Sequence, residues 1–193
     1  MRGALAIAVG LLVALLAAAP ARAGCGGPVR AYAKKRHPRP PLVLGDSTLI
    51  YATPRLARLG LDADAQGCRQ FGQGMLLLRA RKRAGTLPRV VVMTLGANGT
   101  VPGRDLGWAW HLVGPRRKLV LVTPLETGGV ESSDAAHERR EARRRPGRIV
   151  LLDWARYSRD HPGWFASDGL HLTFTGAAAQ ARFIARGVRR GAR

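Results

Sequence analysis

The 193-residue chain is poor in acidic residues, with 12 Asp and Glu against 32 Lys and Arg and a formal net charge of +20. Such a field attracts polyanions, for example teichoic acids, acidic glycans, lipid head groups or nucleic acid. The basic runs contain no interleaved aromatic residues and no RNA-binding signature, so we expect no nucleic-acid partner. Abundant arginine, alanine and glycine are also typical of GC-rich coding, so the charge can be compositional rather than functional.

Long hydrophobic runs are absent beyond the start of the chain. Residues 4–19 are uncharged and apolar, and Pro20 and the small-x-small pattern of residues 21–23 follow them. This arrangement predicts a secretory signal peptide over residues 1–23, cut after Ala23. The alternative is an uncleaved anchor, but the run is shorter than the roughly 18–20 apolar residues of a spanning helix. We therefore expect a secreted or extracytoplasmic bacterial protein with no membrane span in its mature chain, possible association with the cell wall, and a net charge near +18 once the two leader arginines are lost.

Cysteine is scarce, and no residue spacing is typical of a zinc site. The two cysteines, Cys25 and Cys68, would enter an oxidising compartment, where two thiols most simply pair. A bridge between them would close a loop of about 43 residues and stabilise the fold by about 3–4 kcal/mol in the chain-entropy picture. The alternative is that both thiols stay free, as they would if the backbone kept the two cysteines too far apart to form a bridge.

The mature chain has the length of one domain, which we place at residues 41–193 after a basic N-terminal segment over residues 24–40. Apolar runs alternate with helical patterns along it, which predicts a parallel sheet covered by helices on both faces. A helix from about residue 47 to 59 should be kinked or split by Pro54. The five expected strands lie near residues 41–45, 61–66, 89–95, 118–123 and 148–153, and the remaining helices near 70–84, 106–112, 132–145 and 175–188.

Side chains suited to acyl transfer follow these strands. Ser47 comes directly after the first strand, and Asp168 precedes His171 by three residues in the loop before the last helix. A serine can attack a carbonyl, a histidine can take its proton, and an aspartate can hold the imidazole in the right tautomer. Since functional sites of parallel sheets gather at the carboxyl ends of the strands, we expect these three residues to meet there.

Three sequence blocks give a resemblance to a known family. Gly45-Asp46-Ser47, Gly96-x-Asn98 and Asp168-x-x-His171 resemble the blocks of SGNH (GDSL-type) hydrolases over about residues 41–188. Within this family the chain looks most similar to the extracytoplasmic domain of peptidoglycan O-acetyltransferases. The segments that suggest this are residues 95–99, Asp153-Trp154, and residues 168–173 followed by Gly176-Ala177.

The resemblance implies a flavodoxin-like α/β/α fold with a five-stranded parallel sheet in the order 2-1-3-4-5, and a site without metal or cofactor. It assigns the catalytic roles to Ser47, Asp168 and His171. It assigns the oxyanion hole to the Ser47 N–H, the Asn98 amide and a backbone N–H at Cys68, where the family normally has a glycine. The chain departs from many members in having Gly99 after Asn98, and it contains no membrane domain like that of the acetyltransferases.

Other residues have open alternatives. Arg69 could contact substrate or stabilise its loop, and Trp164 could line the substrate mouth. Asp46 is interpreted as structural, as is Asp153, the rival to Asp168. Trp108 and Trp110 could form a sugar platform, but their i, i+2 spacing places them on different faces of a helix, so one should be in the core.

The sequence thus predicts a metal-independent serine esterase that hydrolyses O-acyl, especially O-acetyl, esters. Its expected partners are an acylated cell-wall or other polysaccharide, or a small ester, with anionic cell-wall polymers possible. One alternative is an O-acetyltransferase of the same fold that works with a separate membrane acyl donor. The other is a non-catalytic, cationic module that binds the cell wall.

Overall fold

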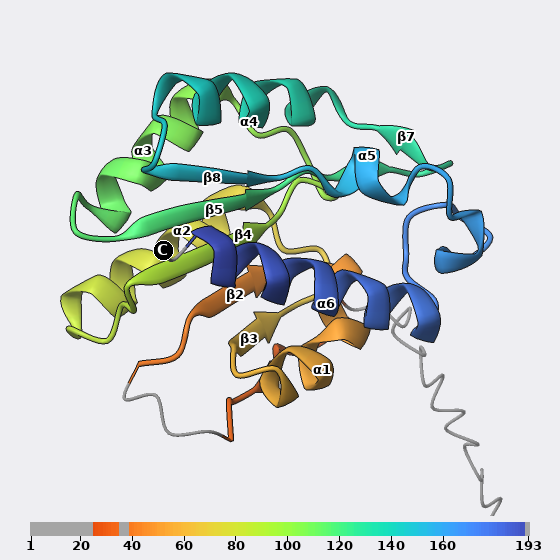
Figure 1. The fold of residues 1–193 in the computed structure, drawn as a ribbon, viewed down its shortest axis with the longest axis horizontal. Helices are drawn as coiled ribbons and strands as arrows, with labels where there is room; N and C mark the ends of the chain where they lie inside the picture. Colours follow the sequence, from red (N-terminus) through yellow and green to blue (C-terminus); the bar gives the residue numbers. More distant parts are fainter. Residues whose placement is uncertain (1–24, 35–38, 192–193) are drawn as a thin grey trace, which may run out of the picture.

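A computed structural model describes residues 25–34 and 39–191 (Figure 1). The expected signal peptide, residues 1–23, lies outside the described residues. The described chain forms three layers, with a central sheet between two sets of helices. No helix within the described ranges is long and apolar enough to cross a membrane.

The central sheet has six strands in the order β1-β3-β2-β4-β5-β8. Five of them run parallel to their neighbours, and in chain order they read 2-1-3-4-5, as predicted. Four of these strands are mainly apolar, as is typical of a parallel sheet that is covered on both faces, whereas the strand Asp62–Ala65 alternates aspartate with alanine. These strands are β2 (Leu42–Gly45), β3 (Asp62–Ala65), β4 (Val90–Thr94), β5 (Lys118–Val122) and β8 (Ile149–Leu152).

The sixth strand, β1 (Val29–Ala31), was not predicted and pairs antiparallel with β3 at the edge of the sheet. It lies within the segment 24–40, which we expected to precede the domain. Its three residues carry too short a pattern to predict a strand. Long-range contacts hold it instead, because Arg30 Nε donates to Asp64 Oδ2 at 2.8 Å and the Ala33 N–H to Asp62 Oδ1 at 2.9 Å.

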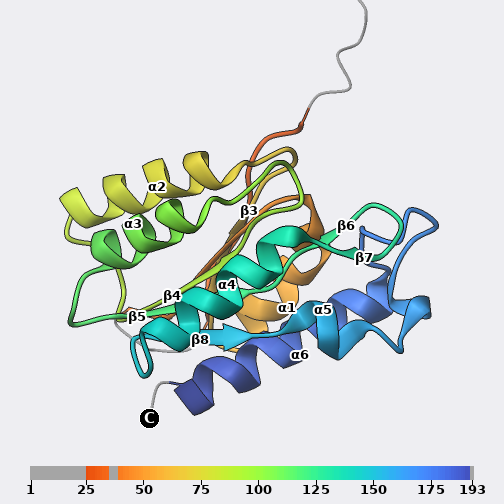
Figure 2. The ribbon, with the colours of Figure 1, turned by 90° about the horizontal axis from the view of Figure 1, so that it is seen from above.

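Helices cover both faces of the sheet (Figure 2). Alternating strand residues divide the core accordingly, since successive side chains point to opposite faces. Val43, Val92 and Val120 pack on one side, while Leu44, Met93 and Leu121 pack on the other. The first side is covered by α1 (Thr53–Arg58) and α6 (Phe174–Gly191), and the second by α2 (Phe71–Arg83), α3 (Gly103–Val113) and α4 (Ser133–Arg144).

The helix expected after β2 is split, as Pro54 predicted. A 3₁₀ helix, η1 (Ser47–Ala52), comes first, and α1 begins at Thr53 with the proline in its first turn. Proline is tolerated there because it removes an N–H that has no partner within the helix. Two further short helices, α5 (Trp154–Ser158) and η2 (Pro162–Trp164), follow β8.

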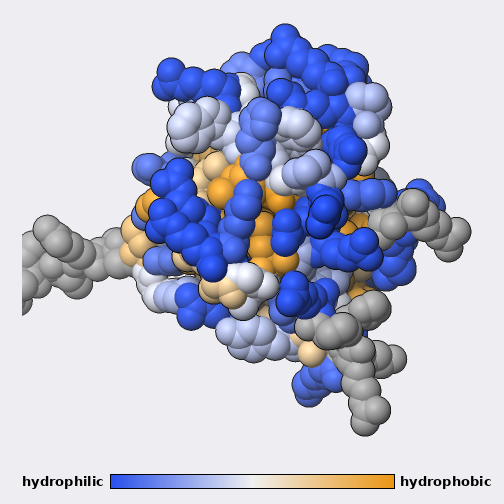
Figure 3. All heavy atoms as spheres, turned by 90° about the vertical axis from the view of Figure 1, so that its left-hand side faces the viewer, coloured by the Kyte–Doolittle hydropathy of each residue, from blue (hydrophilic) through white to orange (hydrophobic). Residues whose placement is uncertain are grey.

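A two-stranded hairpin of β6 (Leu125–Glu126) and β7 (Val130–Glu131) extends from the end of β5 and was not predicted. It lies at the carboxyl end of the sheet, where η1 also begins (Figure 1). Hydrophilic side chains dominate the opposite end of the molecule, around a smaller hydrophobic area (Figure 3). The turn after β2, which carries Ser47, and the hairpin after β5 therefore share the carboxyl end of the sheet.

Candidate active site

Ser47 lies where the sheet ends and a helix begins. β2 ends at Gly45, Asp46 caps the 3₁₀ helix, and Ser47 is its first residue. The N–H of a first helical residue has no partner within the helix. The turn thus presents a serine hydroxyl and an unpaired backbone N–H at the carboxyl end of β2.

His171 and Asp168 come from the loop before α6. His171 Nδ1 lies 2.6 Å from Asp168 Oδ2, and His171 Nε2 lies 2.9 Å from Ser47 Oγ. This geometry fits a tautomer in which Nδ1–H donates to the carboxylate and Nε2 accepts from the serine hydroxyl. Residues 124 positions apart in the chain are therefore joined in one hydrogen-bonded line.

Backbone N–H groups of the same loop hold the Asp168 carboxylate in place. Asp168 Oδ1 accepts the N–H groups of Leu170 and His171 at 2.9 and 3.0 Å. The hydrogen bond from the His171 side chain, followed by that from the Leu170 N–H, lowers the pKa of Asp168 to about 2. Asp168 is consequently ionised throughout the neutral and mildly acidic range and can stabilise a positive charge on the imidazole.

The three donors expected to form an oxyanion hole have no acceptor within the described ranges. One is the Ser47 N–H, at the start of η1. The Asn98 amide nitrogen is buried and has no partner among the described residues. The Cys68 N–H also has no acceptor there, and this residue has a left-handed backbone with φ +54°. Unpaired donors at a nucleophile are what an oxyanion hole requires.

Asp46 holds two of these segments together. Its Oδ1 accepts Thr48 N–H at 3.0 Å and Thr48 Oγ1 at 2.7 Å, and its Oδ2 accepts the Ala97 N–H at 3.2 Å. Burial raises the pKa of Asp46, although these hydrogen bonds oppose the shift. The carboxylate therefore links the turn of Ser47 to the loop of Asn98, which agrees with its structural interpretation.

Arg69 does not contact the site opening, so the predicted substrate contact is wrong for this residue. Its side chain is 2% exposed. The guanidinium donates to Gly45 O at 2.9 Å, to Asp64 O at 2.7 Å and to Asp64 Oδ1 at 2.6 Å. The alternative holds: Arg69 stabilises the loop by joining the ends of β2 and β3.

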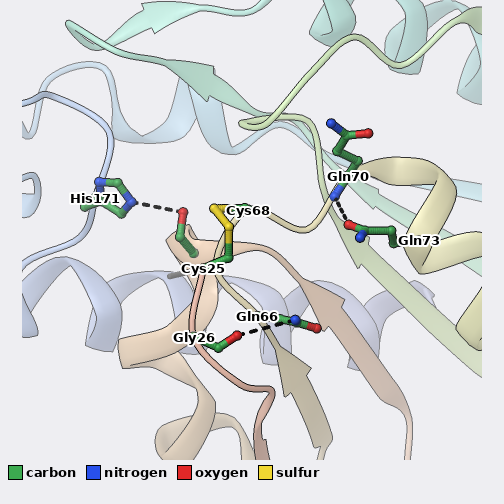
Figure 4. Close-up of a disulfide and its surroundings, with 8 residues drawn as sticks. Cys25, Gly26, Gln66, Cys68, Gln70, Gln73 and His171 are labelled. Atoms are coloured by element: carbon green, nitrogen blue, oxygen red, sulfur yellow. Dashed lines mark hydrogen bonds between the residues drawn. A yellow bond between two sulfur atoms is a disulfide. The ribbon is translucent and has the colours of Figure 1, made fainter. Parts of the chain in front are cut away.

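Cys25 and Cys68 form a disulfide (Figure 4). The same view also shows His171, whose Nε2 accepts the hydrogen bond of the Ser47 hydroxyl. The N-terminal segment packs closely here, because a Cβ on Gly67 would lie 2.2 Å from Cys25 O. The bridge thus fixes the loop that presents the Cys68 N–H.

Trp164 belongs to an aromatic cluster. It stacks on Trp154 with ring centroids 5.6 Å apart and on His161 at 3.8 Å. Trp154 is buried, and Trp164 is half-buried against the same core. A contact between Trp164 and substrate stays a prediction.

The β6–β7 hairpin supports the Asp168 loop, a role that sequence reasoning missed. The Gly128 N–H donates to Asp168 O at 2.6 Å. Gly169 has φ +69°, and a Cβ there would lie 2.5 Å from the Gly129 nitrogen. The sequence signal for this contact was the glycine at positions 128, 129 and 169, because two backbones can approach closely where no Cβ lies between them.

Asp153 is held elsewhere, as its structural interpretation predicted. Its carboxylate pairs with Arg139, at 2.9 Å to Nε and 2.7 Å to Nη2, and caps α5 through the Arg156 N–H. Arg139 also pairs with Glu131 of the hairpin. Asp168, by contrast, is the carboxylate that faces the imidazole. Within the described ranges, no group of three or more His, Cys, Asp or Glu is placed to hold a metal ion.

We compared the chain with known proteins and found that its fold is a known one. No family model matches the chain. The chain has the fold of the SGNH (GDSL-type) hydrolases. The C-terminal catalytic domain of peptidoglycan O-acetyltransferase A from Streptococcus pneumoniae, solved with a methylsulfonyl adduct, superposes with a TM-score of 0.71 at 22% identity, covering 79% of this chain and 94% of that one. A "putative SGNH hydrolase" from Slackia heliotrinireducens gives a TM-score of 0.60 at 18% identity, covering 79% and 100%.

The sequence is also similar to curated proteins. A "Putative O-acetyltransferase" of Staphylococcus aureus strain COL is 26% identical over 147 residues, or 72% of this chain. This match covers 23% of the relative, so the chain spans about a quarter of the length of that protein. The similar proteins thus include hydrolases and acetyltransferases, which share acyl-ester chemistry.

Proposed function

We propose that this protein is an exported serine esterase that hydrolyses O-acetyl or other O-acyl esters on a cell-wall or other polysaccharide. The observation that carries the proposal is the hydrogen-bonded line from Ser47 Oγ through His171 to Asp168, at 2.9 and 2.6 Å. The similarity to acyl-transfer proteins supports the same chemistry.

In the proposed reaction, Ser47 Oγ attacks the ester carbonyl while His171 Nε2 accepts the hydroxyl proton. The imidazolium then gives this proton to the leaving alcohol, and an acyl-serine remains. Water, deprotonated by His171, attacks the acyl group and releases the acid, and Ser47 regains its proton. Asp168 holds Nδ1–H and stabilises the imidazolium in both steps.

The oxyanion formed in each step would accept hydrogen bonds from the Ser47 N–H, the Cys68 N–H and the Asn98 amide. These donors have no acceptor in the part of the chain that the structure describes, which supports the assignment. Donors fixed in advance stabilise the transition state at little reorganisation cost, and losing one typically costs on the order of 2.7–4 kcal/mol.

The proposed export rests on three features. Residues 1–23 have the pattern of a signal peptide, with residues 24–193 as the mature chain. The Cys25–Cys68 disulfide fits an oxidising compartment. The positive charge suits contact with anionic cell-wall polymers.

A fluorophosphonate probe tests the nucleophile. Wild-type protein should be labelled and should release acetate from p-nitrophenyl acetate, whereas Ser47→Ala should do neither. Ser133→Ala is the matched control, because Ser133 is an exposed serine of α4 and forms no hydrogen bond with Ser47, Asp168 or His171 in the described structure. Absence of both labelling and acetate release in wild type would contradict the esterase proposal and favour a non-catalytic wall-binding module.

An O-acetyltransferase of the same fold is the second candidate, favoured by the similarity to named acetyltransferases. The chemistry differs only in the acceptor, because a sugar hydroxyl would replace water in the second step. Incubation with an activated acetyl ester and an unacetylated glycan separates the two. Acetylated glycan identifies a transferase, and free acetate alone identifies a hydrolase.

A further inference from the structure

α3 and α4 form a cationic groove that the proposed reaction does not use. Arg104, Trp108 and His111 of α3 repeat at helical spacing, as do His137, Arg140 and Arg144 of α4. Residues at i, i+3, i+4 and i+7 share one face of a helix. The two stripes therefore line one groove of about 500 Å³ on the surface between the helices.

The charge of this groove is unbalanced. Four arginines line it, and Glu141 is the one carboxylate among the lining residues. Glu141 is buried and paired with Arg144 and Arg145. Arg104 is 85% exposed with its nearest carboxylate 3.7 Å away, and no ion pair of Arg140 is found within the described ranges. Guanidinium groups are planar forks suited to carboxylate or phosphate, and Arg104, Arg140 and Arg144 are exposed to solvent here.

Trp108 adds an aromatic surface to these charges. It is 66% exposed, whereas Trp110 is half-buried against the core, as the helical spacing predicted. An exposed indole with no core contact is unusual for a soluble domain and offers an apolar face to a ring. A flat apolar face between cations matches a sugar ring that carries anionic groups.

The groove begins next to the candidate active site. α3 starts directly after the loop of Asn98, and the Val101 N–H of this loop donates to Asp134 Oδ2 of α4 at 2.7 Å. His137 Nδ1 lies 3.1 Å from Val101 O. From there both helices run toward the end of the molecule opposite the site, where hydrophilic residues dominate the surface (Figure 3).

We propose that the α3–α4 groove is a second binding site, which takes an anionic polysaccharide chain through its arginines and the face of Trp108. This site is distinct from the Ser47 centre and does not depend on the proposed reaction. Its role is to hold a charged glycan strand along the protein, with one end near the loop of Asn98.

Calorimetric titration of the purified protein with polygalacturonate, an acidic sugar polymer, tests this site. Binding should be measurable at 50 mM NaCl and weaker at 300 mM, since salt screens exposed charges. Dextran, a neutral sugar polymer, should not bind. The triple variant Arg104→Gln/Arg140→Gln/Arg144→Gln should weaken binding by about tenfold or more, a change of about 1.4 kcal/mol per decade.

Two matched controls separate the groove from the general charge. The triple variant Arg58→Gln/Arg83→Gln/Arg89→Gln removes the same charge from exposed positions outside the groove, and it should retain most of the affinity. Trp108→Ala should weaken polygalacturonate binding about tenfold, whereas Tyr32→Ala, which removes an aromatic side chain of similar exposure (62%), should not.

Inorganic polyphosphate supplies charge without sugar rings. Trp108→Ala should leave polyphosphate binding unchanged, because the indole would recognise only the sugar. Equal losses in the two triple variants, or an affinity for polygalacturonate that does not depend on Trp108, would overturn the proposal. Thermal unfolding of each variant verifies that the fold is retained, and none of these residues belongs to the Ser47 centre.

Discussion

Arg139 connects the hairpin to the sheet, and its replacement should weaken both stability and catalysis. The side chain makes four hydrogen bonds to two carboxylates, Asp153 at the end of β8 and Glu131 of the hairpin. The hairpin in turn donates the Gly128 N–H to Asp168 O. Arg139→Met keeps the aliphatic stem but removes every donor, so it isolates the charge pairing.

The expected loss of stability follows from burial. The side chains of Arg139 and Asp153 are 19% and 23% exposed, and such a partly buried charged pair contributes about 2 kcal/mol. Glu131 is 36% exposed, so solvent screening limits its pair to about 0.5 kcal/mol. A total of about 2.5 kcal/mol lowers the melting temperature by roughly 5–10 °C in a domain of this size.

The effect should depend on pH. Hydrogen bonds from Arg139 lower the pKa of Glu131, and they lower that of Asp153 against the opposing effect of burial. A carboxyl group whose pKa is lowered by folding stabilises the fold above its unfolded pKa and loses this contribution as the pH falls. The difference in melting temperature between wild type and Arg139→Met should therefore be full at pH 7 and shrink below about pH 4.

Differential scanning fluorimetry at pH 7, 5 and 3.5, together with ester hydrolysis at pH 7, measures both effects. A looser hairpin should lower kcat about tenfold, less than the hundredfold cost of a full 1 Å displacement, since Asp168 stays bonded to His171. Arg143→Met is the control, because Arg143 is exposed on the same helix, lies outside the groove lining and should change neither quantity. A difference that persists unchanged at pH 3.5 would refute the charge-pair argument, and a normal kcat would refute the link to Asp168.

Three further predictions concern the site. Asp168→Asn should lower kcat by about 10³–10⁴ because the imidazole loses the acceptor that sets its tautomer, and single-turnover hydrolysis should show the loss in the chemical step. Asn98→Ala should lower kcat by about 10²–10³ with little change in KM, if its unpaired amide holds the oxyanion; a changed KM alone would speak against this role. Replacing both Cys25 and Cys68 by serine should lower the free energy of unfolding by about 4 kcal/mol, given a separation of 43 residues, and urea unfolding measures it.

Four of the five parallel strands could be predicted because each is a mainly apolar run, whereas β3 reads Asp-Ala-Asp-Ala and its expected range rested on the neighbouring residues 61–66. Val90–Thr94 is buried at every position, and its β-branched residues leave little doubt about a strand. Helix boundaries were predicted within a few residues, as for α2, expected at 70–84 and found at Phe71–Arg83. The order of the strands came from the family resemblance, since no local pattern contains it.

The elements that escaped prediction depend on distant partners. β1 has three residues and joins the sheet through Arg30 and the disulfide of Cys25. The hairpin strands have two residues each and rest on the Asp168 loop. Such elements are stabilised by contacts that only the folded chain brings together, so their own residues carry little signal.

Arg69 shows why residue type alone does not assign a role in a site. Beside a nucleophile, an arginine suggests an anionic substrate, yet here the buried charge is matched internally by Asp64 and two backbone carbonyls. A buried cation needs such partners, since burying it unpaired would be costly. The same requirement explains why Asp64 of β3 lies between two arginines. Its Oδ1 pairs with the guanidinium of Arg69, and its Oδ2 pairs with that of Arg30 on β1. The charged side chains of Arg69, Asp64 and Arg30 therefore join β1, β2 and β3 to one another near the Ser47 turn, and their charges are already matched within the protein.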